Sequence, residues 1–177
     1  MQRYDLTAEM YEERYAEEQK AKFKAALENV EVTGSMVLDV GCGSGLFFRE
    51  VTPQSKIVVG LDISRKLLLK AKDQADDSKN GLVLQADADH LPFKDGSFDV
   101  VFAFTMLQNM PKPVATLKEF MRVVKLGGRV VVTGLKKAFS INAFMDTLEG
   151  SSMKIFSFVD DEDLKCYIAT LTTSANN

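Results

Sequence analysis

The sequence predicts an α/β protein built on a doubly wound, mostly parallel seven-stranded sheet, with an antiparallel strand pair at its C-terminal end. Five short apolar runs recur along the chain, and they are continuous rather than alternating, which is typical of parallel strands buried on both faces. Segments with helical character separate most of these runs. A chain of 177 residues suits one hydrophobic core, so we expect a single domain.

The segment before the first strand predicts a helix. From Asp5 to about Val30 the sequence is rich in Glu, Lys and Ala and contains neither Gly nor Pro. Large side chains recur at every fourth residue in this segment and form one stripe along the helix. The stripe consists of Tyr11, Tyr15, Gln19, Phe23 and Leu27. Gly34 ends the element.

The remaining elements follow from apolar runs and from the positions of Gly and Pro. The runs predicted as parallel strands are Met36–Val40, Lys56–Leu61, Leu82–Ala86, Phe98–Phe104 and RVVVTGL at 129–135, with Gly127–Gly128 before the last. The helices predicted between or after them are Leu46–Val51, about Arg65–Ala75, Pro113 to about Val124, and Ser140 to Leu148. The runs KIFSFV and LKCYIATL flank the acidic residues 160–163 and predict the antiparallel pair.

The composition excludes several classes of protein. A net charge of −3 gives no strong signal for a nucleic acid or membrane partner, and no apolar run reaches the roughly 18 residues of a spanning helix. The N-terminus is polar, unlike a signal peptide. Cys42 and Cys166 are too few for a disulfide framework and lack the spacing of metal ligands. We therefore expect a cytoplasmic protein without a metal site.

The stretch MVLDVGCGSGLFFREV, residues 36–51, places Gly41, Gly43 and Gly45 between two apolar runs. In an open parallel sheet, ligands bind beyond the carboxyl ends of the strands, where this turn should lie. Glycine lets the backbone approach a ligand, and the following helix should present free N–H groups. A nucleotide-containing cofactor is the main hypothesis, and a tight turn without a ligand is the alternative. The turn lacks the Gly-Lys-Ser/Thr of a P-loop, and Leu46 stands where a dinucleotide fingerprint needs Gly or Ala.

The ordered motifs of the chain resemble those of the class I S-adenosylmethionine-dependent methyltransferases, in particular their small members of the methyltransferase domain 11 type. The matching motifs, spread over Met36 to Gly134, are VLDVGCGSG, GLDIS, ADADHLPF, DGSFDVVFAF and LKEFMRVVKLGGRVVVTG. The resemblance implies a Rossmann-like fold, S-adenosyl-L-methionine as cofactor, and methyl transfer to an unidentified small molecule, RNA or protein. The alternatives are a cofactor-binding but non-catalytic regulatory relative and, disfavoured by Leu46, a nucleotide-binding oxidoreductase.

Several residues are expected to hold the cofactor. Asp62 ends the second strand and can accept hydrogen bonds from both ribose hydroxyls, although it could instead cap the next helix, a role that Ser64 could also fill. Ile63 can lie against the adenine face, and Asp87 can accept from the adenine amino group. The full set is Asp39, which faces the methionine amino group, with Gly41, Cys42, Gly43, Gly45, Leu46, Asp62, Ile63, Asp87, Ala88 and Phe104.

The acceptor side is less well defined. The stretch FTMLQNMPKP after the fourth strand should line the methyl group, and it lacks the Asn/Asp-Pro-Pro-Tyr/Phe of many N-methylating relatives. The resemblance implies that an N-terminal helical lid, 1–33, folds over a cofactor-binding core, 34–177. Plain packing of the lid tyrosines on the core is the alternative. The acceptor-site candidates are Tyr11, Tyr15, Thr105 and Gln108. We expect His90 to be a pocket wall or exposed loop residue, and Met106, Met110 and Met121 to fill the core.

A local excess of basic residues allows a further hypothesis. Between Lys112 and Lys137 there are seven Lys and Arg residues and a single acid, Glu119. We expect Lys112, Lys136 and Lys137 on the cofactor side, where they could bind an anionic acceptor such as RNA or a phosphorylated metabolite. A solvated basic face is the alternative. The chain shows no inserted substrate domain, so a helper protein is a possible partner.

Overall fold

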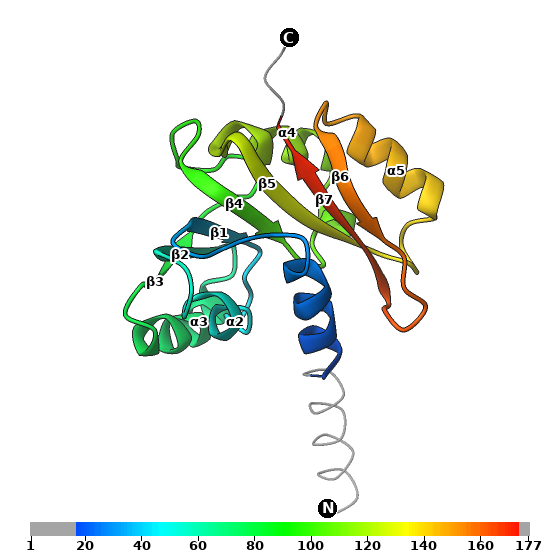
Figure 1. Ribbon diagram of the computed structural model, residues 1–177. Coiled ribbons are helices and arrows are strands. Elements are labelled where there is room, and N and C mark those ends of the chain that lie inside the picture. The colour runs from blue at the N-terminus through cyan, green and yellow to red at the C-terminus, as the bar shows by residue number, and fades with distance from the viewer. Residues whose placement is uncertain (1–16, 174–177) are drawn as a thin grey trace, which may run out of the picture.

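The computed structural model describes residues 17–173 and forms one seven-stranded sheet of order β3-β2-β1-β4-β5-β7-β6 (Figure 1). The strands are β1 (Met36–Val40), β2 (Ile57–Asp62), β3 (Gly81–Gln85), β4 (Phe98–Ala103), β5 (Val124–Leu135), β6 (Lys154–Val159) and β7 (Cys166–Thr172). The first five strands pair in parallel, while β7 runs antiparallel to both β5 and β6. The predicted fold class is confirmed.

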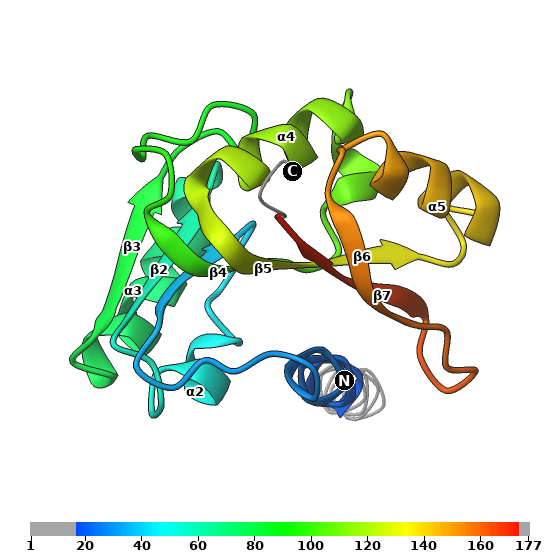
Figure 2. The ribbon, with the colours of Figure 1, turned by 45° about the horizontal axis from the view of Figure 1, so that its top comes forward.

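Helices cover both faces of the sheet (Figure 2). They are a helix over residues 17–27, α2 (Phe48–Val51), α3 (Arg65–Asp77), the 3₁₀ turn η1 (Leu107–Asn109), α4 (Pro113–Val123) and α5 (Ile141–Glu149). Helices α4 and α5 lie on one face, and α2, α3 and the helix over 17–27 lie on the other. One apolar cluster contains Phe120 and Phe144, and the second contains Phe23 and Phe47. No helix within residues 17–173 has the length and apolar character needed to cross a membrane.

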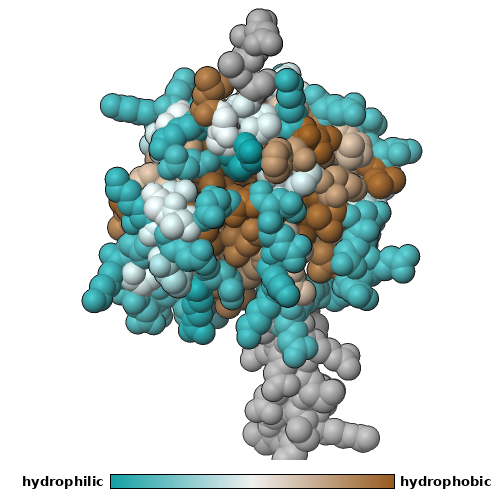
Figure 3. Space-filling model, viewed as in Figure 1, coloured by the Kyte–Doolittle hydropathy of each residue, from teal (hydrophilic) through white to brown (hydrophobic). Residues whose placement is uncertain are grey.

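The helix over residues 17–27 docks on the sheet through one side. Phe23 and Ala26 are buried in the second cluster, while Lys20 and Lys24 are exposed. Figure 3 shows hydrophilic side chains along this helix and hydrophobic ones on either side of it. The predicted stripe therefore explains how the helix docks. Tyr11, Tyr15 and the rest of residues 1–16 of the proposed lid lie outside the described residues, so the division into lid and core stays a prediction.

Two predicted elements differ from the structure. The helix predicted over Leu46–Val51 is a single turn, α2, because the preceding glycine turn continues to Leu46 with Gly45 at φ +81°. The fifth strand begins earlier than predicted, at Val124, so that Gly127 and Gly128 lie inside β5. The β4–β5 register shifts between Phe98 and Val100, which accommodates this irregular start.

The edge strand β3 is less covered than its apolar sequence predicts. Leu82 is 56% exposed and Leu84 is 38% exposed, because no helix connects β3 to β4. Residues 86–97 form a loop in that place, and the loop lies beside α4 rather than over β3. The expectation that helices cover both faces of every parallel strand is therefore wrong at this edge.

Candidate functional site

A cavity of about 640 Å³ opens at the carboxyl ends of β1, β2 and β4. Strand β1 pairs with β2 on one side and β4 on the other, so this is the point where the sheet changes its direction of growth. The cavity is lined by all the residues expected around the cofactor except Gly45. Among the acceptor-site candidates, Thr105 lines it and Gln108 does not, while Tyr11 and Tyr15 lie outside the described residues. The binding roles of these residues stay predictions.

The glycine turn serves two different purposes. Gly43 has φ +56°, and a Cβ atom placed on it would meet no atom within 4 Å, so its backbone faces open space in the cavity. Gly45 is also in the left-handed region, but a Cβ atom there would lie 2.9 Å from the Phe48 ring and 3.0 Å from the Ala71 backbone. Gly45 therefore lets α2 and α3 pack closely, and its expected role at the cofactor stays a prediction.

Asp62 fastens the glycine turn to the end of β2. One carboxylate oxygen accepts the Gly43 N–H at 2.9 Å, and the other accepts the Ser64 N–H at 2.8 Å. Each oxygen keeps a lone pair for a further donor. Ser64 is the N-cap of α3 and accepts from the Leu67 N–H, so α3 does not need Asp62 as its cap. Asp62 is a preorganised acceptor at the cavity wall.

Asp39 is a carboxylate in the cavity with only 3% of its surface exposed. Burial, and then the neighbouring Asp62, raise the pKa of Asp39 to about 7. Within residues 17–173 no hydrogen bond to this carboxylate is found, although a buried charge ordinarily requires a partner. The site is therefore suited to a cationic group. Burial also raises the pKa of the adjacent Cys42 thiol, which makes it a poor nucleophile.

The loop after β3 forms another wall of the cavity. Asp87 and Ala88 line the cavity, and the Asp87 carboxylate accepts the Asp89 N–H at 2.9 Å, which shapes the loop. Asp89 lines the cavity as well and accepts a hydrogen bond from the buried Thr116 of α4. Side chains from α4 therefore influence the position of the residues expected at the adenine.

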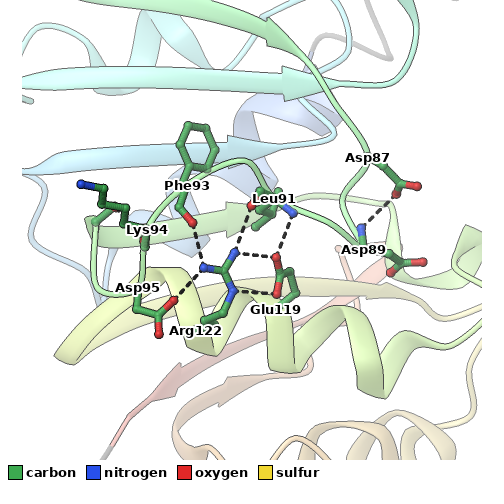
Figure 4. Close-up of polar contacts among 9 residues, drawn as sticks. Asp87, Asp89, Leu91, Phe93, Lys94, Asp95, Glu119 and Arg122 are labelled. Carbon is green, nitrogen blue, oxygen red and sulfur yellow. Dashed lines mark hydrogen bonds and ion pairs between the residues drawn. The ribbon is translucent and has the colours of Figure 1, made fainter.

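Glu119 and Arg122 of α4 hold the far end of this loop (Figure 4). Arg122 donates to the Leu91 and Phe93 carbonyls at 3.0 and 2.7 Å, and it pairs with Glu119 at 2.6 Å. Glu119 also accepts the Leu91 N–H at 2.8 Å. Hydrogen bonds from Arg122 lower the pKa of the Glu119 carboxyl, so this acid stays charged. The loop is thus clamped although no helix follows β3.

The helix over residues 17–27 closes the acceptor side. Gln19 and Phe23 line the cavity, and the Phe23 ring lies 4.8 Å from the Phe47 ring and 4.9 Å from the Phe104 ring between centroids. Lys22 does not line the cavity, but its ammonium donates to the Thr105 hydroxyl at 2.8 Å. This helix therefore contributes Gln19 and Phe23 to the cavity wall, while Tyr11 and Tyr15 lie outside the described residues.

Sequence reasoning missed several lining residues. They are Gln19, Phe23, Ser44, Phe47, Leu61, Leu67, Ala86 and Asp89. The predicted stripe contained Gln19 and Phe23 but gave no reason to expect them at a pocket rather than in the core. Met106, Asn109, Met110 and Pro111 also line the cavity, and they belong to the stretch after β4 that was expected beside the methyl group. Met106 belongs to both pocket and core, being 9% exposed and lining the cavity. Met121 lies outside the cavity and packs against the first cluster, as expected.

The basic segment does not surround the cavity. No Lys or Arg appears among the described residues that line it, so Lys112, Lys136 and Lys137 are not part of the cavity wall, although Lys112 follows the lining residue Pro111 and Lys136 follows the carboxyl end of β5. Lys136 pairs with Asp160 at 2.7 Å, which ties it to the loop before β7. The His90 side chain is 86% exposed, as a loop residue. Within residues 17–173 no cluster of three His, Cys, Asp or Glu side chains could hold a metal ion.

Known proteins resemble this chain over the same region. A family model described as "Methyltransferase domain" matches residues 38–132. A demethylmenaquinone methyltransferase of Lactococcus lactis is 44% identical over 107 residues, which are 57% of this chain and 42% of that protein. A ubiquinone biosynthesis O-methyltransferase of Coxiella burnetii is 28% identical over 131 residues, 73% of this chain and 55% of that protein. The chain spans about half the length of these curated relatives.

Solved structures agree on the fold. A SAM-dependent methyltransferase from Aquifex aeolicus superposes with a TM-score of 0.76 at 20% identity, over 84% of this chain and 87% of that one. A Haloferax volcanii methyltransferase, solved in complex with the Trm112 methyltransferase activator, has a TM-score of 0.74 at 19% identity, over 86% and 88%. Because fold alone does not specify chemistry, the function is argued from the cavity.

Proposed function

The chain belongs to the methyltransferase domain family, within the class I S-adenosylmethionine-dependent superfamily, and on this premise we propose that it methylates a small, largely apolar acceptor in the cavity. The observation that carries the proposal is the buried, uncompensated Asp39 beside a glycine turn whose backbone is open to the cavity at Gly43. A ligand that combines a cationic amino group with a nucleoside satisfies both features.

The described residues fit S-adenosyl-L-methionine, the cofactor of this superfamily. Asp39 would face its amino group, Asp62 its ribose hydroxyls, and Asp87 with Ala88 its adenine. The cavity volume lies within the range of small-molecule sites. When bound, the cofactor supplies a methyl group that is already activated on a sulfonium sulfur. The chain then has to orient the acceptor and exclude water.

The lining on the acceptor side favours an aromatic molecule over an anionic one. Phe23, Phe104, Met106 and Met110 provide apolar surface, and no basic side chain of the described residues lines the cavity. This weakens the hypotheses of RNA or a phosphorylated metabolite. Two relatives, a demethylmenaquinone methyltransferase and a ubiquinone biosynthesis O-methyltransferase, support an aromatic acceptor with ring hydroxyl groups. We therefore propose a hydroquinone-like substrate class.

The first experiment measures cofactor binding by calorimetry. S-adenosyl-L-methionine and its demethylated product should bind, and NAD should not. Asp62→Ala should weaken binding by about 1–3 kcal/mol, the scale of hydrogen bonds to a charged group. Asp73→Ala, at an exposed position of α3, serves as the matched control. Equal affinities for Asp62→Ala and the unaltered protein would contradict the ribose assignment.

The second experiment follows methyl transfer from labelled cofactor to 1,4-dihydroxynaphthalene. It is run with and without cell extract, because one solved neighbour was crystallised with an activator protein. Transfer to the probe supports the proposed function. Cofactor binding without transfer to the probe or to any extract component would indicate the non-catalytic regulatory alternative.

A further inference from the structure

Thr105, the second residue after β4, is held in an unusual conformation by three parts of the fold. Its φ of +55° is rare for a β-branched residue, and such strain persists only where surrounding contacts enforce it. Its N–H donates to the buried Thr133 hydroxyl at 2.7 Å, and its carbonyl accepts from the Gln108 amide at 2.6 Å. Its hydroxyl accepts from Lys22 at 2.8 Å. Thr105 therefore lines the cavity, with its hydroxyl held by Lys22.

Lys22 is a lysine with only 4% of its surface exposed. Within residues 17–173, the Lys22 amino group makes a single hydrogen bond, to Thr105. Burial lowers the pKa of Lys22, while Cys166 and then Glu18 act in the opposite direction. A buried lysine of this kind can serve as a neutral amine that takes up a proton.

The charged surroundings of Lys22 do not supply a carboxylate partner at close range. Glu18, on the same helix, forms its ion pair with Lys165 instead. Cys166, which faces Lys22 from β7, is a buried thiol whose pKa burial raises, so it is neutral near pH 7. Lys136 acts on that thiol and pairs with Asp160. In the part of the chain that the structure describes, Lys22 is therefore coupled to the cavity through Thr105.

We propose that Thr105 and Lys22 form a proton-accepting pair that deprotonates a hydroxyl group of the acceptor, an inference that rests on the proposed function. In the structure Lys22 donates to the Thr105 hydroxyl; once the Lys22 amine is neutral, its lone pair can instead accept the Thr105 hydroxyl proton across the same contact. The acceptor hydroxyl then gives its proton to the Thr105 oxygen as the Thr105 hydroxyl proton passes to the neutral Lys22 amine. Lys22 becomes an ammonium, and the electron pair of the broken O–H bond remains on the acceptor, which becomes the nucleophile. Lys22 releases the proton to water before the next turnover. Thr105 touches the acceptor, and Lys22 acts through it as a positioning and proton-storing residue.

The geometry distinguishes this pair from the other polar groups near the cavity. His90 is exposed, and Gln108 does not line the cavity. Asp39 and Asp62 belong to the part assigned to the cofactor. Within residues 17–173, Thr105 is thus the lining residue that combines a position shortly after β4 with a hydrogen bond to a buried amine.

The first test is an NMR titration of ¹³C-lysine-labelled protein, which requires no methyl transfer. The Lys22 resonance, assigned by its loss in Lys22→Arg, should titrate below the ordinary lysine pKa of 10.5. Thr105→Val should alter the Lys22 titration. Titration of Lys22 at the ordinary lysine value would overturn the proposal, whatever the activity of the protein.

The second test is the pH profile of transfer to 1,4-dihydroxynaphthalene. Lys22→Arg keeps a donor to Thr105 but cannot act as a neutral amine, so kcat should fall roughly 100-fold or more. The increase of rate with pH that belongs to Lys22 should disappear, while cofactor affinity and circular dichroism stay as in the unaltered protein. Thr105→Val should lose the same activity and the same pH dependence as Lys22→Arg. Thr105→Ser keeps the hydroxyl group and should retain activity. Lys24→Arg is the matched control.

The outcomes separate this proposal from the proposed function. If the unaltered protein methylates the probe and Lys22→Arg keeps its rate and its pH profile, the pair is contradicted and the proposed function stands. If the unaltered protein binds cofactor but methylates no hydroxyl acceptor, the proposed function is contradicted. The proposed proton-accepting role of Thr105 and Lys22 is then contradicted as well.

Discussion

The two halves of the cavity are built by different means. The cofactor half consists of neighbouring residues: the turn from β1 and the end of β2, joined by main-chain N–H groups and the Asp62 carboxylate. The acceptor half is assembled from distant parts of the chain, because Lys22 and Thr105 are 83 positions apart and Thr105 and Thr133 are 28 apart. Main-chain turns at neighbouring strand ends form most of the first half, with the loop after β3 held by side chains of α4. Side-chain contacts between distant elements determine the second half.

The largest expected effect is in the cofactor half, at Gly43. Gly43→Val places a branched side chain in the open space of the cavity, so cofactor binding should no longer be detectable by calorimetry. Gly34→Val is a matched control, since Gly34 also has positive φ and open space at Cβ but lies before β1, away from the cavity. Both variants should keep a native-like circular dichroism spectrum. Normal binding by Gly43→Val would mean that the turn is structural only.

A second prediction concerns Asp39 and pH. Its pKa is about 7 in the folded protein and has its ordinary value of 3.8 in the unfolded chain, so the folded state holds the extra proton between these values. This proton stabilises the folded state at low pH. The stabilisation is lost as pH rises from about 4 through 7, and the free energy of unfolding falls by up to about 4 kcal/mol. Asp39→Asn should remove this part of the pH dependence, measured as Tm at pH 5 and pH 8. Cofactor, with its cationic amino group, should stabilise the unaltered protein more at pH 8 than at pH 5.

An equal Tm difference between pH 5 and pH 8 in both proteins would show that Asp39 keeps an ordinary pKa. That result would change the comparison of the two halves, because Asp39 would then not distinguish the cofactor half by a shifted pKa.

A third, smaller effect is expected at the clamp on the loop after β3. Arg122→Met removes hydrogen bonds to the Leu91 and Phe93 carbonyls, so stability should fall by about 1–3 kcal/mol. Affinity for adenosine should fall as well, because the same loop carries Asp87 and Ala88. Lys118→Met, at an exposed position of α4, is the control. Unchanged adenosine affinity would show that the cofactor half does not depend on α4.

The same difference explains how much the sequence could predict. The fold class and the residues expected at the cofactor follow from short motifs, because Asp39, Gly43 and Asp62 lie at or near strand ends whose positions local patterns indicate. The packing role of Gly45 was not foreseen, since nothing local distinguishes a glycine that faces a ligand from one that admits a neighbouring helix. Lys22 was missed because its partner is 83 positions away, and a lysine in a helix is ordinarily solvated. The leucines of β3 are exposed because no helix lies between β3 and β4. The apolar pattern of β3 itself does not show whether such a helix follows.

The docking of the helix over residues 17–27 has a consequence for folding. This helix precedes β1 and is not a strand connection of the parallel sheet, so the sheet can form before the helix is in place. Contacts between positions far apart in sequence carry a large entropic cost of loop closure, and elements attached through them tend to open in sub-global fluctuations. The chain therefore has a route to a partly open state in which Phe23 and Lys22 leave Phe104 and Thr105 while the turn at Gly43 keeps its shape. In that state the cofactor would still be bound, and the acceptor could enter or leave.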